Sequence, residues 1–516
     1  MAAETLIRGQ VHTNDPPRPR AGAVLVRGDR VAAVGDFDDL RALSPSANIL
    51  DAGTGAVLPG LVDGHAHPSM LGRALATARL DGARSMEDVV ATACAWAHEH
   101  PHGWVLGHGW DDSRWAGGLA LDASAIDMAF PYRPALLLRV DGHAALANRA
   151  ARETAGLLDG AADPPGGRII RDVRGLPTGL VVDAAMELVA AQVPSPTAAE
   201  RATYLTTALE YASSLGLTGV HDAGIDPETD ATYRHLAQAQ RLPLRVFAMA
   251  DLSRPGGLDL VRSGVRPESD RYELRAVKLF ADGALGSRGA QLFEPYADEP
   301  SHSGLAVQSD DQMWRLGSEA ARRGFQLCIH AIGDRANARV LDLYERIQAE
   351  GVPLDRPRLE HAQILRASDV ARIRALGVVC SMQPIHAVTD AAFAEQRLGS
   401  SRLVHAYACR ALARAGVPVA FGSDFPVASP DPRLGLDAAT HGGGWRSNDG
   451  LTIDEAVDGY TWRNAFASFH EHELGRLAPG WLADLTILAR DPFEDGDFAS
   501  APVLATWVGG QVHRFR

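Results

Sequence analysis

Short apolar runs that alternate with helical stretches constrain the fold of this chain more than any other feature of its sequence. Eight such runs occur, and most are followed by a stretch typical of a helix, such as Ala199–Leu215. This alternation is typical of parallel strands joined by helices, and eight units predict a (β/α)8 TIM-like barrel of the α/β class. The predicted strands are Leu58–His65, Leu217–Asp222, Leu244–Ala250, Ala276–Ala281, Phe325–His330, Arg358–His361, Val378–Met382 and Val417–Ser423.

Strand patterns also occur at both ends of the chain, outside the predicted barrel. Ala23–Arg27 and Arg30–Gly35 flank a Gly-Asp turn, which is typical of a hairpin, and Asp484–Leu488 and Leu504–Val508 have a similar strand character. Chain termini often lie close together. We therefore predict one small β-sandwich domain built from residues 1–57 and 478–516, with the barrel over residues 58–477. Two unrelated β extensions are the alternative.

The interval between the first and second predicted strands is too long for a simple strand–helix unit. Roughly 150 residues separate these strands, whereas one such unit needs ~30. We therefore predict a large insertion over about residues 69–200. It contains four of the nine tryptophans, and we expect it to approach the C-terminal face of the barrel, where Trp104, Trp110 or Trp115 would form an apolar wall.

Composition limits the classes of partner. Lys and Arg total 50 against 64 for Asp and Glu, and this net charge of −14 argues against nucleic acid and against an anionic membrane surface. The four cysteines include no Cys-X-X-Cys pair, so neither a disulfide framework nor a structural zinc knot is indicated. The start lacks the pattern of a signal peptide, and no apolar run approaches ~18–20 residues. We expect a cytoplasmic protein with a small-molecule substrate, and a homodimer is left open.

Side chains that can bind or bridge metal ions lie at the ends of five predicted strands. His65 and His67 are two residues apart, so in an extended strand both imidazoles point to the same side and could hold one ion. Each residue also has an ordinary explanation: Lys278 could pair with Asp282 or Glu360, for example. Because the functional residues of such barrels lie at the C-terminal strand ends, the coincidence predicts one metal site. The candidates are His65, His67, Lys278, His330, His361 and Asp424.

The motifs around these residues resemble the amidohydrolase superfamily of metal-dependent hydrolases. Within it they resemble the YtcJ-like branch, which includes N-substituted formamide deformylases. The resemblance covers nearly the whole chain, and each motif alone would be weak. The matching segments are Leu58–His67, Arg139–Ala144, Val277–Arg288, Ile329–Ala336, Glu360–Gln363, Met382–Pro384 and Gly422–Val427.

The resemblance implies a centre of one or two divalent metal ions, with zinc as the first expectation. All six candidate residues would be ligands, and Lys278 would be carboxylated so that its carbamate bridges two ions. An unmodified Lys278 beside a single ion is the alternative. The implied reaction is hydrolysis of a C–N bond, in an amide, formamide or similar small molecule, by metal-activated hydroxide. Asp424 would carry the proton.

Residues around this centre receive further roles. Asp63 and Glu360 are candidates to orient the imidazoles. We expect Asp141, His143, His221 and Trp110 to contact substrate, although the first three could instead tie the insertion to the barrel. The rival function is a barrel that has lost catalysis and acts as a ligand-binding or assembly scaffold, and the complete ligand set argues against it. Carbamates, cyclic imides, lactones and dipeptide-like amides remain alternatives as substrates.

Overall fold

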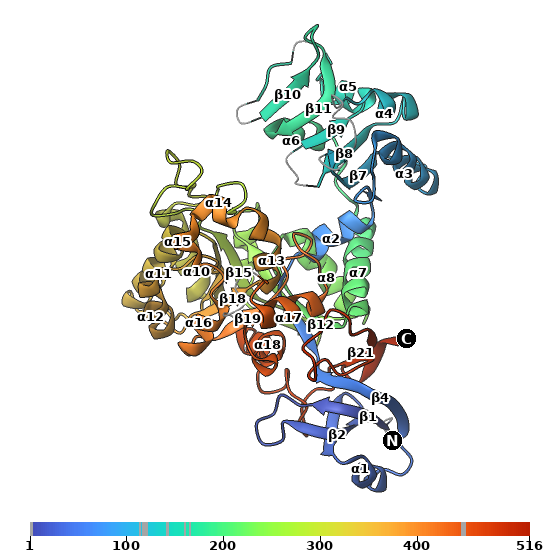
Figure 1. Cartoon of the computed structure of the whole chain (residues 1–516), viewed down its shortest axis with the longest axis vertical. Coiled ribbons are helices and arrows are strands. Elements are labelled where there is room, and N and C mark those ends of the chain that lie inside the picture. The colour runs from blue at the N-terminus through green and yellow to red at the C-terminus, as the bar shows by residue number, and fades with distance from the viewer. Residues whose placement is uncertain are drawn as a thin grey trace. The chain divides into compact units, whose positions relative to one another are not determined.

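The computed structural model describes residues 4–112, 115, 122–140, 144–158, 161–164, 167–444 and 450–515. These residues form two compact units. The first comprises Met1–Pro68 and Ala208–Arg516, and the second comprises Ser69–Thr207 (Figure 1).

The first unit contains a nearly closed barrel of eight parallel strands. Along the sheet their order is β19-β18-β17-β16-β15-β13-β12-β5, and a parallel bridge joins Ala66 at the end of β5 to Phe425, four residues beyond β19. Strands of a parallel barrel are buried on both faces, which explains why they are nearly continuous apolar runs in the sequence. The strands are β5 (Leu61–Ala66), β12 (Leu217–Ile225), β13 (Arg245–Asp251), β15 (Tyr272–Phe280), β16 (Gln326–Ala331), β17 (Arg358–His361), β18 (Val379–Met382) and β19 (Val419–Phe421), and β14 (Arg266–Ser269) pairs with β15.

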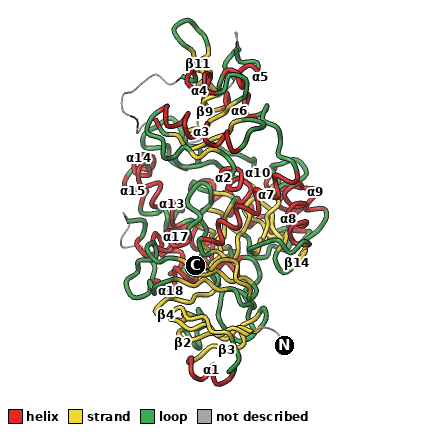
Figure 2. The backbone as a smooth tube through the Cα atoms, turned by 90° about the vertical axis from the view of Figure 1, so that its right-hand side faces the viewer, coloured by secondary structure: helices red, strands yellow, loops and turns green. Residues whose placement is uncertain are grey.

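Helices alternate with these strands along the chain and form an outer layer around them (Figure 2). Helix α10 (Asp310–Arg322) illustrates their local signals: Ser309 accepts a hydrogen bond from the Gln312 N–H, and two aspartates occupy the first turn. The other helices after β12 are α8 (Pro227–Gln238), α9 (Gly257–Arg262), α11 (Asp334–Ala349), α12 (Ala367–Ala375), α13 (Pro384–Thr389), the 3₁₀ helix η2 (Asp390–Ala392), α14 (Ala394–Leu398), α15 (Ser400–Leu403), α16 (Cys409–Arg414), α17 (Pro432–His441), α18 (Ile453–Tyr460) and α19 (Trp462–Ala467).

Strands from both ends of the chain pair in one seven-stranded sheet, in the order β22-β21-β20-β4-β1-β2-β3. The junction lies between β20 and β4, where Thr486 is paired with Leu58. Leu58 therefore belongs to this sheet, and the first barrel strand begins at Leu61 rather than at Leu58 as expected. The second sheet that a sandwich requires stays a prediction. The elements are β1 (Glu4–His12), β2 (Arg20–Arg27), β3 (Arg30–Gly35), α1 (Phe37–Leu43), β4 (Asn48–Pro59), β20 (Leu485–Leu488), β21 (Val503–Val508) and β22 (Gln511–Phe515).

The second unit has its own six-stranded sheet, in the order β10-β11-β9-β8-β7-β6. Trp110 lies in its core, fully buried, and its indole N–H donates a hydrogen bond to the Leu137 carbonyl at 2.8 Å. The elements between β5 and β12 are α2 (Pro68–Leu75), β6 (Ala78–Arg79), α3 (Met86–Glu99), β7 (Val105–Trp110), α4 (Ser124–Ala129), β8 (Ala135–Arg139), β9 (Ala144–Ala147), α5 (Arg149–Thr154), β10 (Gly167–Arg171), β11 (Pro177–Asp183), α6 (Ala184–Ala190) and α7 (Ala198–Ser214).

Within the described ranges, no helix combines the length and the apolar character needed to cross a membrane.

Candidate metal centre

The six predicted metal-site residues lie at the C-terminal ends of barrel strands. His65, Lys278, His330 and His361 lie on β5, β15, β16 and β17, and His67 and Asp424 follow β5 and β19. The Asp424 Oδ1 atom lies 3.2 Å from His67 Nε2 and 3.6 Å from His65 Nε2. Lys278 Nζ lies 3.2 Å from His65 Nε2. The His361 ring completes the group, with its centroid 4.7 Å from that of His65 and 4.5 Å from that of His330.

Unusual backbone conformations occur at two of these residues. His361 has φ 76° and Asp424 has φ 61°, both in the left-handed region that non-glycine residues seldom adopt. Such conformations cost about 1–3 kcal/mol each and persist where surrounding contacts enforce them. At Asp424 the enforcing contact is a hydrogen bond from its backbone N–H to the His65 carbonyl at 2.7 Å. Two of the functional side chains are therefore presented by strained backbone.

A fully buried carboxylate orients His65. The His65 Nδ1–H donates to Glu360 Oε2 at 2.5 Å, and Arg358 Nε lies 2.7 Å from Glu360 Oε1. Burial opposes ionisation of Glu360, but the Arg358 cation and His65 hold the pKa of this carboxyl well below its usual range. Burial lowers the pKa of His65 to about 4, and the Lys278 cation adds to this effect. His65 is therefore a neutral imidazole whose Nε2 lone pair faces the centre, which is the form that binds metals.

His361 is oriented in a similar way. Its Nδ1–H donates to Gln383 Oε1 at 2.7 Å, and the Gln383 amide is held in turn by the Ser381 carbonyl. Glu360 thus has the orienting role predicted for it. Among the described residues, Asp63 has no hydrogen bond to an imidazole: it accepts hydrogen bonds from the His65 backbone N–H at 3.1 Å and from Ser423. Asp63 therefore connects the ends of β5 and β19, because its carboxylate binds the backbone N–H groups of His65 and Ser423.

Lys278 is buried inside β15 and has no carboxylate partner within the described ranges. Its Nζ lies 3.2 Å from His65 Nε2 and 5.1 Å from the centre of the Phe280 ring. Asp282 instead accepts hydrogen bonds from three backbone N–H groups, and Glu360 is paired with Arg358. Burial lowers the pKa of Lys278. The ion pair considered from the sequence is therefore not formed here.

His330 supplies an observation that tests whether a metal would fit. Its Nε2 is buried and has no hydrogen-bond partner among the residues that the structure describes, and Asp282 Oδ1 lies 3.6 Å away. Burial lowers the pKa of His330 to about 3, so the ring is neutral. Nitrogen and carboxylate donors at these separations suit zinc and similar ions, whose ligand bonds are about 2.0–2.2 Å long. The residues present therefore fit a divalent metal.

The centre also contains a histidine that was not predicted from the sequence. His386 lies in α13, four residues beyond the end of β18, and its Nε2 is 4.0 Å from Asp424 Oδ2. Asp424 thus belongs to two clusters of potential ligands, one with His65 and His67 and the other with His361 and His386. The Met382–Pro384 motif ends two residues before His386. This proximity is the one signal in the sequence that could have identified His386.

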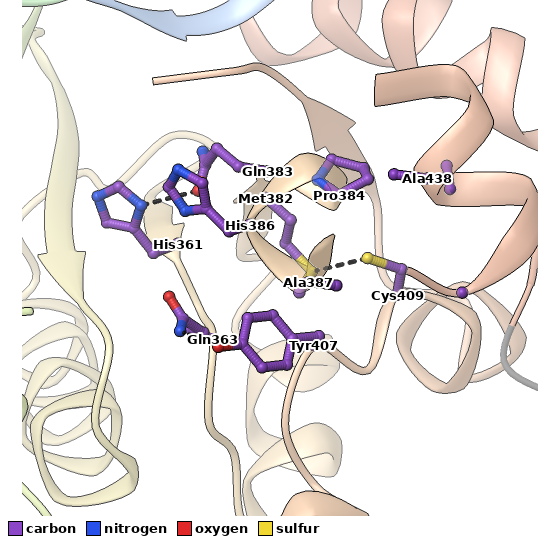
Figure 3. Close-up of a pocket in the computed structure, with 12 residues that line it drawn as sticks. His361, Gln363, Met382, Gln383, Pro384, His386, Ala387, Tyr407, Cys409 and Ala438 are labelled. Atoms are coloured by element: carbon purple, nitrogen blue, oxygen red, sulfur yellow. Dashed lines mark hydrogen bonds between the residues drawn. The ribbon is translucent and has the colours of Figure 1, made fainter. Parts of the chain in front are cut away.

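A pocket adjoins His361 and His386 (Figure 3). Gln363 and Tyr407 form a polar edge, where the Gln363 amide donates to the Tyr407 hydroxyl at 2.7 Å. The apolar part of the lining is Met382, Pro384, Ala387, Ala438 and Ala439.

Two of the four predicted substrate contacts are described by the structure, and two lie outside the described residues. His221 is buried in β12, and its Nδ1 lies 3.0 Å from Arg358 Nη1, so it contacts the arginine behind the metal centre. Trp110 is a core residue of the second unit. Asp141 and His143 lie outside the described residues. Substrate binding by these four residues stays a prediction.

Comparison with known proteins decides the family. The sequence pattern described as "Amidohydrolase family" matches residues 48–513, and a bacterial imidazolonepropionase-like composite domain matches residues 22–47. The chain belongs to the amidohydrolase family. Membership supports a hydrolase activity and does not favour the inactive scaffold.

Relatives of this amidohydrolase extend over its whole length. It is 35% identical to the protein LONG AFTER FAR-RED 3 of Arabidopsis thaliana, over 99% of this chain and 91% of that protein. It is 30% identical to YtcJ of Bacillus subtilis (strain 168), named as a putative amidohydrolase, over 98% of each chain. It is 29% identical to the N-substituted formamide deformylase of Arthrobacter pascens, over 98% and 97%. These matches are consistent with the YtcJ-like branch.

Solved structures of metal-dependent hydrolases have a similar fold. An uncharacterized metal-dependent hydrolase from Pyrococcus horikoshii OT3 superimposes with a TM-score of 0.82 at 26% identity, over 97% of this chain and 100% of that one. A second such hydrolase, from Pyrococcus furiosus, gives a TM-score of 0.81 at 28% identity, over 95% and 100%.

Proposed function

We propose that this amidohydrolase is a metal-dependent enzyme that cleaves the C–N bond of a small N-substituted amide or formamide. The observation that carries the proposal is the convergence of four histidines, one lysine and one aspartate on a buried centre, with Asp424 3.2–3.6 Å from two imidazoles. The deformylase name of one relative supports the choice of substrate class.

His65, His67, Lys278, His330, His361 and Asp424 would hold one or two divalent ions, with zinc as our choice. When bound, such ions supply an activated water and polarise the substrate carbonyl. The environment of Lys278 supports its conversion to a bridging carbamate. Burial lowers the pKa of Lys278, and the neutral amine is the form that adds to carbon dioxide. That addition forms an N–C bond and releases one proton. It replaces a neutral amine with an anionic oxygen ligand.

In this proposal the Asp424 carboxylate carries the proton. Burial opposes its ionisation, but the hydrogen bond to His67, together with His65 and His361, holds its pKa well below the usual range. The ionised carboxylate accepts a proton as water adds to the carbonyl carbon, and it returns this proton to the nitrogen as the C–N bond breaks. Its buried position beside the imidazoles supports this transfer, because bulk water does not surround the carboxylate.

The pocket beside His361 would take the part of the substrate next to the reacting carbonyl. Its apolar side is formed by Met382, Pro384, Ala438 and Ala439 (Figure 3). Short alanine side chains leave room for an apolar substituent. The Gln363 NH2 group donates to Asp390 and Tyr407, which leaves the Gln363 carbonyl oxygen for a polar substituent. This lining supports an N-alkyl or N-aryl amide over a highly charged substrate.

The test is hydrolysis by the full chain after zinc loading, with metal content measured on the same sample. The panel contains N-alkyl and N-benzyl formamides, N-substituted acetamides, carbamates, cyclic imides, dipeptide-like amides and lactones, and chelator-treated protein is the control. We expect zinc-dependent release of an amine from at least one formamide or amide. Zinc-loaded protein that cleaves only lactones, or nothing at all, would contradict the proposal. Failure to hold any metal would support the scaffold alternative.

A further inference from the structure

His386 is a buried imidazole that none of the six proposed ligand positions includes. It is 8% exposed, and its Nε2 has no hydrogen-bond partner among the described residues. The Asp424 Oδ2 atom lies 4.0 Å from this nitrogen. A buried donor without a protein partner is available to bind a group that enters the site.

The distance to Asp424 is longer for His386 than for two of the proposed ligands, although His361, His386 and Asp424 lie close enough together to hold an ion. Two ligands on one tetrahedral ion, with bonds of about 2.0–2.2 Å, lie roughly 3.3–3.6 Å apart. His67 and His65 are within about 0.1 Å of this range, at 3.2 and 3.6 Å from Asp424 Oδ1. His386 lies 4.0 Å from Oδ2, which is too far for two ligands in that geometry.

The second ring nitrogen also distinguishes His386 from two of the proposed ligands. A ligating histidine usually donates its other N–H to a fixed acceptor. His65 does so to Glu360, and His361 does so to Gln383. Within the part of the chain that the structure describes, no acceptor holds His386 Nδ1. The ring therefore lacks the anchoring of the ligands, although it lies nearly parallel to the His361 ring, at an interplanar angle of 13°.

We propose that His386 is a catalytic residue whose Nε2–H donates a hydrogen bond to the substrate carbonyl oxygen as that oxygen gains negative charge. Asp424 supports this geometry, because its Oδ1 faces His65 and His67 while its Oδ2 faces His386. A carbonyl on the Oδ2 side would have its oxygen near His386 and its nitrogen within reach of Asp424. His386 also lines the pocket proposed for the substituent (Figure 3).

The bonding changes in this step balance. As water adds to the carbonyl carbon, the C=O π pair moves onto oxygen, where the His386 N–H stabilises the charge, and Asp424 takes the water's proton. The pair then re-forms the carbonyl, the C–N bond breaks, and Asp424 protonates the leaving nitrogen. His386 neither gains nor loses a proton. The role assigned to His386 rests on the proposed hydrolase function.

The experiment compares His386→Phe and His386→Gln with wild type, and uses His405→Phe as a matched control because His405 is exposed. Zinc content, kcat and KM for a cleaved amide, and calorimetric binding of methylphosphonate to the zinc-loaded protein are measured. Methylphosphonate mimics the tetrahedral, negatively charged reaction centre. We expect unchanged zinc in all variants, and a loss of kcat of about 100- to 1000-fold in His386→Phe with KM changed far less. Methylphosphonate binding should be at least about tenfold weaker. His386→Gln, which retains an N–H donor, should fall between the two.

Loss of zinc from a folded His386→Phe protein would make His386 a ligand and overturn the proposal. So would wild-type kcat, or wild-type affinity for methylphosphonate, in that variant. If His386→Phe does not fold, the same criteria apply to His386→Gln. Methylphosphonate binding also separates this proposal from the proposed function. A wild-type protein that binds methylphosphonate through His386 but hydrolyses no amide would disprove the amide hydrolase and retain the oxyanion site, whereas no binding to wild type would disprove the oxyanion site.

Discussion

Replacing Glu360 by glutamine removes one negative charge from the interior of the barrel and nearly preserves side-chain volume. Glu360 and Arg358 are both fully buried, and their ion pair has an Nε–Oε1 distance of 2.7 Å. The change leaves the Arg358 cation with the Gly64 carbonyl, the Ser381 hydroxyl and His221 as neutral partners. It also replaces the carboxylate that accepts the His65 Nδ1–H by a weaker amide acceptor.

Breaking a buried ion pair by removing one partner typically costs about 3–5 kcal/mol, because the remaining charge is uncompensated. We expect that loss in the free energy of unfolding, measured by urea denaturation of the full chain in excess chelator. Loss of a group that orients a ligand typically weakens metal binding by about 10- to 100-fold, and zinc titration of the same variant should show it. Glu345→Gln is the matched control, since its 2.8 Å pair with Arg372 is partly exposed and should contribute at most about 1 kcal/mol.

A double variant separates the two effects. Arg358→Met with Glu360→Leu removes both charges, and replacing a buried pair by apolar side chains is often neutral or stabilising. We expect the double variant to be more stable than Glu360→Gln by at least about 1 kcal/mol. Zinc affinity should stay low, because His65 still lacks its acceptor. A Glu360→Gln protein within about 1 kcal/mol of wild type, or a double variant less stable than the single one, would refute the reasoning.

Three further predictions concern single residues. Asp424→Asn in zinc-loaded protein should lower kcat by at least about 100-fold, and substantial activity would remove Asp424 from the proton transfer. Lys278→Ala should lose zinc and activity, with partial recovery of both in added acetate; full zinc content with near-normal turnover would exclude the carbamate bridge. Burial opposes protonation of His470, but hydrogen bonds to Glu273 and Glu473 outweigh it and raise its pKa above 6.5. Its stabilising effect is therefore fully present below pH 6.5 and lost as the pH rises through the folded-state pKa. Urea denaturation of His470→Gln should show destabilisation at about pH 5.5 that disappears near about pH 9, and a constant difference would contradict the assignment.

The boundary of the first barrel strand shows where local patterns stop being informative. The apolar residues from Ala56 to Val62 are interrupted only by Pro59 and Gly60, and periodicity alone predicts one strand from Leu58. In the structure the segment is divided between two sheets, because Leu58 pairs with Thr486 near the other end of the chain. The division depends on a partner more than 400 positions away, and no local pattern encodes that partner.

The eight-strand barrel and the six residues that converge at its centre could be predicted from the sequence. Both follow from simple rules, since apolar strands alternate with helices and the C-terminal ends of parallel strands meet at one face. The sequence also made Glu360 a candidate to orient an imidazole, but the folded chain was needed to show that this imidazole is His65 and that Arg358 supports Glu360. It was also needed to place His386 at the centre. His65 and Glu360 are 295 positions apart. Such contacts, which select the nitrogen that each imidazole presents, arise from packing between strands and leave no trace in local periodicity.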